Sequence, residues 1–369
     1  MTDSLKLVHE VHLEVSNSCN LQCNYCYFVS KKNEVEDFPL SQLERIIRRL
    51  FCRSCEDVNI VFHGGEPLLR SAEWYRDACD IIKSLAHEYH KKVRFQLQTN
   101  GTLLTERHVE VFQKYKVIVS VSLDGPAIIH NAVRGGFHKS ISAIRTLQES
   151  YIFGSVISVI SRHNFRDVSK IVELLVELNV KSYHFNIASI VGPNKELVLS
   201  PEEITEYYIG AFLSFIQFYE KICDWVLLGK MRRFVTGVIP KFHCDSPVCG
   251  AGLYKVHVLP DGSFYPCGSC VSTNEARKLF LQGNLFETQS LDQEQFLSEF
   301  HSLYFTKRGL CEKCTANIIC DFFCSAFDTF DPHTANNRCI ATQNFYSFLL
   351  SQKRGEIEKI VDFYNNKNV

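Results

Sequence analysis

The sequence lacks an excess of charge of either sign. It has 40 Lys and Arg residues against 41 Asp and Glu residues, a formal net charge of -1 at pH 7. Surfaces that bind nucleic acid are usually strongly basic, so nucleic acid is not an expected partner. The hydrophobic fraction of 46% and the charged fraction of 22% are ordinary for a folded protein.

Long uninterrupted hydrophobic runs are also absent. The first ten residues, MTDSLKLVHE, contain no apolar stretch of the kind found in a secretory signal. The most apolar long segment, residues 207–229, is interrupted by Glu220, Lys221 and Asp224, so we expect a buried or amphipathic helix there rather than a membrane span. We see no internal repeat and no low-complexity tract. The simplest expectation is a cytoplasmic protein without a membrane partner.

Cysteine, in contrast, is abundant. Of the 16 cysteines, seven lie before residue 240 and nine lie between Cys244 and Cys339. A short secreted chain would use such cysteines for disulfides, but this chain is long and shows no export signal. Because the cytosol keeps thiols reduced, the cysteines favour metal binding or catalysis.

Residues 8–190 alternate between short apolar runs and amphipathic stretches. The predicted strands are residues 8–15, 58–62, 93–98, 117–122, 155–160 and 182–187, and the predicted helices are residues 40–52, 71–89, 105–114, 138–149 and 165–178. This order predicts an α/β fold with a parallel sheet, open or curled into a partial (β/α)6 TIM-like barrel. Ligands of such folds bind at the carboxyl ends of the strands, where SNSCNLQC, HGGEP, QTNG and LDGP are found.

We divide the chain into a barrel domain (1–195), a bridging helical segment (196–243), a cysteine-rich domain (244–340) and a C-terminal helix with a tail (341–369). Ser200-Pro201-Glu202-Glu203 is a good helix start, and we expect this helix to reach about Leu228. The cysteine-rich part shows little regular periodicity. Metal ligands are therefore expected to supply much of its stability.

Three cysteines follow the first predicted strand within eight residues: Cys19, Cys23 and Cys26. A structural zinc usually takes four ligands, whereas three thiolates on a four-iron cluster leave one iron open to a small molecule. The next cysteine, Cys52, lies beyond a predicted helix. Three reduced thiols in a loop are the alternative, although exposed thiols this dense would be prone to oxidation.

The spacing Cys19-x3-Cys23-x2-Cys26, with Tyr25 before the last cysteine, resembles the signature of the radical S-adenosylmethionine (radical SAM) superfamily. The resemblance implies a 4Fe-4S cluster on these cysteines, whose open iron chelates S-adenosylmethionine. It also implies reductive cleavage of this cofactor to a 5′-deoxyadenosyl radical, which takes a hydrogen atom from the substrate. The electron would come from a low-potential donor of the flavodoxin or ferredoxin type.

Other loops at strand ends resemble further parts of this family's cofactor site. A tight turn would explain HGGEP, but the segment also resembles the GGEP element that contacts the methionine amino group; its residues are Gly64, Gly65, Glu66 and Pro67. By the same resemblance, Ser122 would bond the methionine or ribose, and Arg134 would pair with the ligand carboxylate. Alternatively, Asp124 and Gly125 make a simple turn and Arg134 is solvated.

The second cysteine region resembles the SPASM domain, the auxiliary-cluster module of radical enzymes that modify peptides. Cys244 adds an eighth thiol to the seven-cysteine pattern, enough for two 4Fe-4S clusters and three in all. By position, the first auxiliary cluster would use Cys244, Cys249, Cys267 and Cys324, and the second would use Cys311, Cys314, Cys320 and Cys339. Two zinc sites on the same cysteines are the alternative.

Some candidates fall outside both cysteine patterns. Cys270 lies close to a proposed ligand and is either a spare thiol or a functional one. Cys52 and Cys55 are interpreted as buried, inert thiols. Gln98 and Asn100, at a strand end, are candidate hydrogen-bond partners for the substrate.

The resemblance covers essentially the whole chain and implies an oxidoreductase that modifies a peptide or protein. The motif order resembles anaerobic sulfatase-maturating enzymes, which oxidise Cys or Ser to formylglycine. Those enzymes place an Asp, thought to be the catalytic base, after the Cys of YPC, whereas Gly268 follows Cys267 here. We therefore expect a maturase that forms a carbon–carbon cross-link, a cyclophane, in a ribosomally made peptide (a RiPP), with formylglycine formation as the alternative.

Partners follow from the same resemblance. Many peptide maturases carry an N-terminal leader-binding domain, and the sequence before Cys19 leaves no room for one. A leader, if there is one, would be bound by the barrel, by the SPASM region or by a separate leader-binding protein. A zinc-stapled interaction protein is the hypothesis from another class, and it would explain only the second cysteine region.

Overall fold

The computed structural model describes residues 5–26, 38–188, 195–238, 250–287, 311, 313–320 and 332–366. The chain divides into two compact units, each built from segments far apart in the sequence. The first unit comprises Met1–Ser122, Gly136–Gly154 and Gly250–His301, and the second comprises Leu123–Gly135, Ser155–Cys249 and Ser302–Val369. The four domains expected from the sequence stay a prediction.

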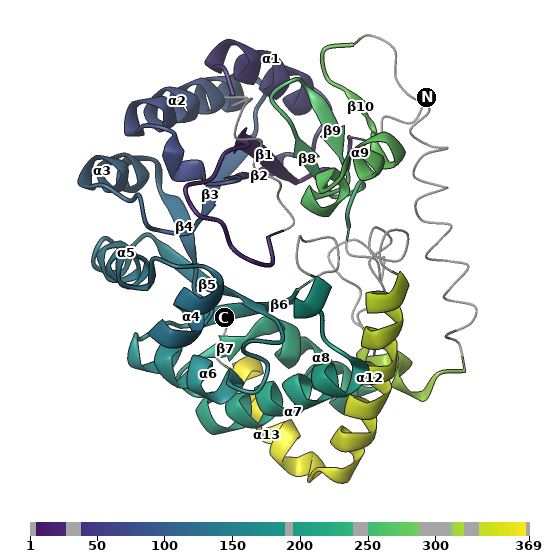
Figure 1. The fold of residues 1–369 in the computed structure, drawn as a ribbon. Coiled ribbons are helices and arrows are strands. Elements are labelled where there is room, and N and C mark those ends of the chain that lie inside the picture. The colour runs from purple at the N-terminus through teal and green to yellow at the C-terminus, as the bar shows by residue number, and fades with distance from the viewer. Residues whose placement is uncertain are drawn as a thin grey trace. The chain divides into compact units, whose positions relative to one another are not determined.

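The first unit is built on a sheet that is mostly parallel (Figure 1). Its strands are β1 (Glu10–Ser16), β2 (Asp57–Gly64), β3 (Lys92–Thr99), β4 (Val117–Ser122), β8 (Lys255–Val258), β9 (Ser263–Tyr265) and β10 (Gly283–Asn284). β1 lies between β2 and β8 and runs parallel to both, whereas β9 and β10 are antiparallel additions. The segment after residue 250 thus extends the sheet that the N-terminal strands begin.

Helices accompany the strands of the first unit (Figure 1). They are α1 (Leu40–Phe51), α2 (Ala72–Glu88), α3 (Glu106–Tyr115), α5 (Phe137–Glu149) and α9 (Asn274–Phe280), with short turns η1 (Pro67–Leu69) and η3 (Gly268–Val271). On β1, Val11, Leu13 and Val15 are fully buried. Because side chains alternate along a strand, the polar residues of β1 occupy the opposite face.

The second unit combines a few parallel strands with longer helices. It contains most of β5 (Phe153–Ile160), β6 (Ser182–Ile187), β7 (Cys223–Asp224), α4 (Ala127–Val133), α6 (Val168–Glu177), η2 (Lys195–Leu197), α7 (Pro201–Phe218), α8 (Trp225–Thr236), η4 (Thr315–Ile319), α12 (Pro332–Ser351) and α13 (Arg354–Asn366). Phe212, Met231, Phe345 and Ile360 share one apolar core. This core holds α7, α8, α12 and α13 together.

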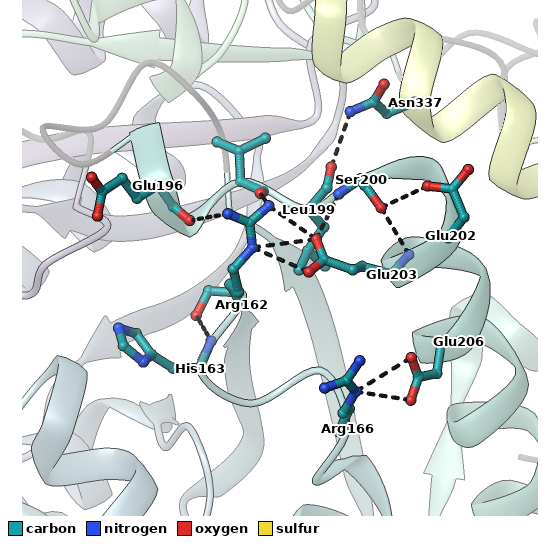
Figure 2. A network of polar contacts seen from close by, with 12 residues as sticks. Arg162, His163, Arg166, Glu196, Leu199, Ser200, Glu202, Glu203, Glu206 and Asn337 are labelled. Atoms are coloured by element: carbon teal, nitrogen blue, oxygen red, sulfur yellow. Dashed lines mark hydrogen bonds and ion pairs between the residues drawn. The ribbon is translucent and has the colours of Figure 1, made fainter.

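The start of α7 is fixed by a polar network (Figure 2). Ser200 Oγ accepts from the Glu203 amide at 3.2 Å, while the Glu203 carboxylate accepts from the Ser200 amide at 2.8 Å. Arg162 donates to Glu203, and Asn337 of α12 donates to the Leu199 carbonyl at 3.0 Å. The expected helix start at Ser200 is therefore confirmed, and the beginning of α12 is tied to it.

The six predicted strands and five predicted helices are confirmed with small shifts at their ends. The helix expected to reach Leu228 is wrong, because α7 ends at Phe218. Asp224 instead pairs with β6 through β7 and accepts from the Leu227 amide at 2.9 Å, which starts α8. The single C-terminal helix is also corrected: α12 begins at Pro332 and is followed by α13.

The sequence did not predict α4 or strands β8 to β10. These strands lie in the cysteine-rich part, where the sequence shows little regular periodicity. Within the described part of the chain, no helix is long and apolar enough to cross a membrane.

Candidate cofactor and cluster site

The HGGEP loop packs directly on the cysteine loop. The Gly65 amide donates to the Ser16 carbonyl at 2.8 Å, and the Glu66 amide donates to the Ser18 carbonyl at 2.8 Å. A Cβ on Gly64 would lie 2.3 Å from the Ser16 oxygen, and one on Gly65 would lie 2.2 Å from the Ser18 oxygen. Both distances are far too short for a side chain. The two glycines are therefore needed for the approach of the cysteine loop, which a simple turn would not explain.

The buried Glu66 carboxylate accepts several hydrogen bonds between the ends of β2 and β3. Only 1% of the residue is exposed. Its oxygens accept from the Leu68 amide at 2.8 Å, the Asn100 amide at 2.8 Å and the Thr99 hydroxyl at 2.5 Å. Pro67 adds an anchor, because its carbonyl accepts from the Tyr75 hydroxyl at 2.8 Å. These bonds fix the end of β2 to the end of β3.

Asn100 links the end of β3 to the cysteine loop. Its Nδ2 donates to Asn20 Oδ1 at 3.0 Å and lies 4.0 Å from Cys19 Sγ, while Asn20 donates to the Thr102 hydroxyl at 2.8 Å. The sequence analysis placed Asn100 at a strand end and suggested a substrate contact. It missed Asn20 and Thr99, which lie in the SNSCNLQC and QTNG loops that it singled out, and Thr102, which directly follows QTNG.

Cys19, Cys23 and Cys26 share this short loop and are all partly buried. The Leu21 amide donates to Cys19 Sγ at 3.4 Å, and the Cys26 amide donates to the Cys23 carbonyl at 3.0 Å. As placed, no three His, Cys, Asp or Glu side chains in the described residues could together hold a metal ion. The donor set itself, three thiols on one loop with amide donors nearby, suits an iron–sulfur cluster.

The segment after β4 organises Arg134. Asp124 is fully buried; its Oδ2 accepts from Arg134 Nε at 3.1 Å, and its Oδ1 accepts from the Val159 amide at 2.8 Å. His130 Nδ1 accepts from the Asp124 amide at 3.1 Å. Burial lowers the pKa of His130, which keeps the ring neutral as this bond requires. The Arg134 side chain is only 11% exposed, so the alternative of a solvated Arg134 is wrong. Ser122 is buried at the end of β4.

Two cysteines of the second region form a pair in the first unit. Cys267 Sγ and Cys270 Sγ are 3.7 Å apart, and Cys270 is fully buried. A hydrogen bond from Cys270 lowers the pKa of Cys267. This shift favours the thiolate, the form in which cysteine binds metals.

The remaining described cysteines of this region belong to the second unit. Cys311, Cys314 and Cys320 surround η4, and Cys339 lies in α12. The Ile319 carbonyl, next to Cys320, accepts from Lys230 Nζ at 3.2 Å and from Arg233 Nη2 at 3.0 Å. Both cations are buried, with 6% and 2% exposed. Cys244, Cys249 and Cys324, predicted as ligands of the first auxiliary cluster, lie outside the described residues.

The interpretation of Cys52 and Cys55 as buried thiols is corrected. Cys52 is exposed at the end of α1, where its thiol donates to the Arg49 carbonyl, and Cys55 is only partly buried. The helix ends at this surface, so neither thiol is enclosed. Gln98 is partly buried on β3 and hydrogen-bonds to His63.

This arrangement agrees with a comparison against known families. Residues 13–195 match the model of the radical SAM superfamily, and the chain is an enzyme of this superfamily. The family implies a 4Fe-4S cluster and S-adenosylmethionine as cofactors.

Within the superfamily, the chain is similar to sulfatase maturases. It is 26% identical over 276 residues to the cysteine-type anaerobic sulfatase-maturating enzyme of Clostridium novyi, which covers 68% of this chain and 71% of that one. The fold matches native anSMEcpe with bound AdoMet and Cp18Cys peptide, with a TM-score of 0.79, 21% identity and coverage of 97% and 99% of the two chains. Streptococcus suis SuiB bound to S-adenosylmethionine matches with a TM-score of 0.63, 17% identity and coverage of 89% and 76%.

Proposed function

We propose that this enzyme modifies a peptide or protein substrate, and that it forms a carbon–carbon cross-link of the cyclophane type in a ribosomally made peptide. The observation that carries the cross-link is Gly268, which follows Cys267 at the start of η3 and has no side chain to accept a proton. Sulfatase maturases are thought to use an Asp at this place. Formylglycine formation is the second candidate, because the relative from Clostridium novyi is named a cysteine-type anaerobic sulfatase-maturating enzyme.

For the cofactor site, we propose that Cys19, Cys23 and Cys26 hold the first cluster. When bound, this cluster supplies the electron that cleaves S-adenosylmethionine. The packing of Gly64 and Gly65 on the cysteine loop supports this role, since it holds Ser18, the residue before Cys19, against the Glu66 amide. Gly64 to Pro67 and Ser122 would orient the methionine and ribose, and Arg134, held by Asp124, would pair with the carboxylate.

Two auxiliary 4Fe-4S clusters complete the proposal. The lowered pKa of Cys267 supports a ligand there, and the buried Lys230 and Arg233 beside Cys320 favour a site of negative charge. The cysteine sets stay those predicted from the sequence. We further propose a low-potential donor of the flavodoxin or ferredoxin type, a separate leader-binding protein if a leader is used, and a cytoplasmic location.

The test begins with anaerobic reconstitution, followed by dithionite and S-adenosylmethionine. We expect 5′-deoxyadenosine from the parent and none from a variant with Cys19, Cys23 and Cys26 all changed to Ala. Cys52→Ala, which removes an exposed thiol outside the proposed ligand sets, is the matched control and should retain activity.

Synthetic peptides then separate the two chemistries. One set carries a Cys or Ser in the centre, and another carries an aromatic residue next to an aliphatic or polar side chain. An aldehyde trapped by hydroxylamine would establish formylglycine formation and remove the cross-link proposal. A cross-linked product would instead resist fragmentation between the two joined residues.

A further inference from the structure

Five ionisable side chains gather on one face of the first unit, and neither the cluster ligands nor the GGEP element includes them. We call Glu10, His12, Glu14, His63 and His257 the histidine cluster. His12 Nε2 is 2.8 Å from Glu10 Oε1, and His257 Nε2 is 2.9 Å from Glu14 Oε2. The ring centres are 5.7 Å apart for His12 and His63, 6.4 Å for His12 and His257, and 6.1 Å for His63 and His257.

Strand register places this cluster directly below the cofactor loops. Glu14 of β1 lies opposite His63 of β2, and His12 lies opposite His257 of β8. His63 immediately precedes Gly64, and Glu14 is two residues before Ser16, whose carbonyl binds the HGGEP loop. The histidine cluster therefore begins at the level of the candidate cofactor site and continues toward the amino ends of the strands.

The side chains of the histidine cluster differ in how much of their surface is exposed to solvent. Glu14 and His257 are almost completely buried, with 2% and 1% of their side chains exposed. His12 and Glu10 are partly open, with 26% and 33% exposed. His63 is partly buried, and along β1 the contact with solvent increases from Glu14 to Glu10.

The hydrogen bonds leave proton acceptors in the interior. A neutral imidazole that donates from Nε2 to a carboxylate keeps Nδ1 as an acceptor. In the described residues, the Nδ1 atoms of His63 and His257 are buried and have no hydrogen-bond partner. Buried polar atoms are nearly always paired, so two neighbouring exceptions call for a role. Rings about 6 Å apart can exchange a proton through one bridging water.

The surroundings of His12 and His63 favour the neutral form of these two rings. Burial lowers the pKa of His63 to about 3 and also lowers the pKa of His12. The hydrogen bond from His12 lowers the pKa of Glu10 to about 2, which keeps this carboxylate ionised. The other charged or titratable groups that act on the cluster are Lys255 of β8 and Tyr265 of β9.

We propose that His63 accepts the proton released by the substrate and that the pairs His257–Glu14 and His12–Glu10 carry it toward solvent. This inference depends on the proposed function. With the first cluster and S-adenosylmethionine bound, hydrogen-atom abstraction would break a substrate C–H bond and leave a carbon radical on the substrate. Completing either product would then require this radical to lose one electron, to an auxiliary iron–sulfur cluster, and one proton, to the His63 ring.

A weakly basic ring is sufficient for this step. Once the electron has left, the proton is bound to a cationic carbon centre or to a protonated carbonyl or thiocarbonyl group. Such species are strong acids, so a neutral imidazole with a low pKa still accepts their proton. The same requirement applies to cross-linking and to formylglycine formation, and the histidine cluster would serve either one in place of a side chain at Gly268.

The experiment measures 5′-deoxyadenosine and peptide product in the same reaction, using the holoenzyme and the peptide sets described above. The variants are His63→Gln, His257→Gln and the partly exposed His12→Gln, with His138→Gln on the surface of α5 as the matched control. Iron content is recorded for each. We expect 5′-deoxyadenosine within about twofold of the parent but product from His63→Gln reduced by about 10²-fold or more. In His63→Ala, added imidazole should restore product at least tenfold, which a purely structural role would not predict.

The outcomes separate the two proposals. Failure of the parent to modify any peptide would overturn the proposed function, and this inference with it. If the parent forms product and all three cluster variants match it, only the proton route is wrong. Loss of 5′-deoxyadenosine together with product, at full iron content, would place the cluster before hydrogen abstraction and also overturn the inference. His12→Gln keeps the test decisive if His63→Gln or His257→Gln fails to fold.

Discussion

At the scale of single residues, two glycines decide whether the cysteine loop can take its position. Gly65→Ala would put a methyl group 2.2 Å from the Ser18 oxygen. We expect a loss of about 1–3 kcal/mol from overpacking, together with lower iron content and less 5′-deoxyadenosine. Gly229→Ala in α8, where a Cβ meets nothing within 4 Å, is the control and should stabilise the protein by about 0.5–1 kcal/mol. Equal iron content in both variants would contradict this account.

The Glu66 carboxylate gives a second prediction at this scale. Glu66→Gln replaces one acceptor oxygen by an NH2 group, so at least one of the Leu68, Thr99 and Asn100 donors loses its partner. Urea unfolding should show a loss of about 1–3 kcal/mol. Glu73→Gln removes an exposed ion pair with Arg107 and should cost much less, because solvent screens such pairs. A similar cost for both changes would show that burial of Glu66 is irrelevant.

At the scale of elements, the break between α7 and α8 depends on Asp224. Its carboxylate caps α8 through the Leu227 amide, and its backbone belongs to β7. Asp224→Ala is expected to reduce the free energy of unfolding by about 0.5–2 kcal/mol, whereas Asp224→Asn keeps a capping oxygen and should cost less. Thermal or urea unfolding of the two variants checks this order, and a reversed order would reject the cap as the cause.

Burial of His63 on β2, beside β1, is expected to make the stability of the folded protein depend on pH. Its folded pKa of about 3 lies below the ordinary value of 6.5, so between these values the unfolded chain binds a proton that the folded chain does not. Stability should therefore fall as the pH drops from 6.5, by up to about 2 kcal/mol at pH 5. Glu10 does not contribute in this window, because its carboxylate loses its stabilising effect only as the pH falls from 4.5 toward 2.

Urea unfolding at pH 7 and pH 5 measures this effect. The drop should be smaller in His63→Gln, which has no titrating ring at this position. His138→Gln should behave like the parent, since that histidine is exposed on α5. An unchanged drop in His63→Gln would mean that another group controls the acid sensitivity.

At the scale of the whole molecule, the number of proposed clusters predicts how much iron each chain contains. Three 4Fe-4S clusters correspond to about twelve irons per chain. The triple Cys19, Cys23 and Cys26 variant should contain about eight, since it would lose only the first cluster. Iron and sulfide analysis of anaerobically purified protein tests these values. Zinc in place of iron would instead support the interaction-protein hypothesis and remove the radical mechanism.

The sequence by itself determined the strands and helices of the barrel region and the cysteine motif of the superfamily. These features are local: apolar periodicity sets β1 to β6, and the three cysteines of the motif lie within eight residues. Local patterns also identified Ser200 as the start of α7, because a capping residue acts on the next turn of its own helix.

Only the tertiary structure decided which distant residues meet. β8 joins β1 across about 240 residues, and this pairing brings His257 to Glu14. The sequence of β8 could not predict this pairing, because four residues are too few to show a clear periodicity. The strand is also stabilised by hydrogen bonds to β1, which lies far away in the sequence. Likewise, Glu66 looked like a ligand contact in HGGEP, and its bonds to Thr99 and Asn100 appear only when β2 and β3 lie side by side.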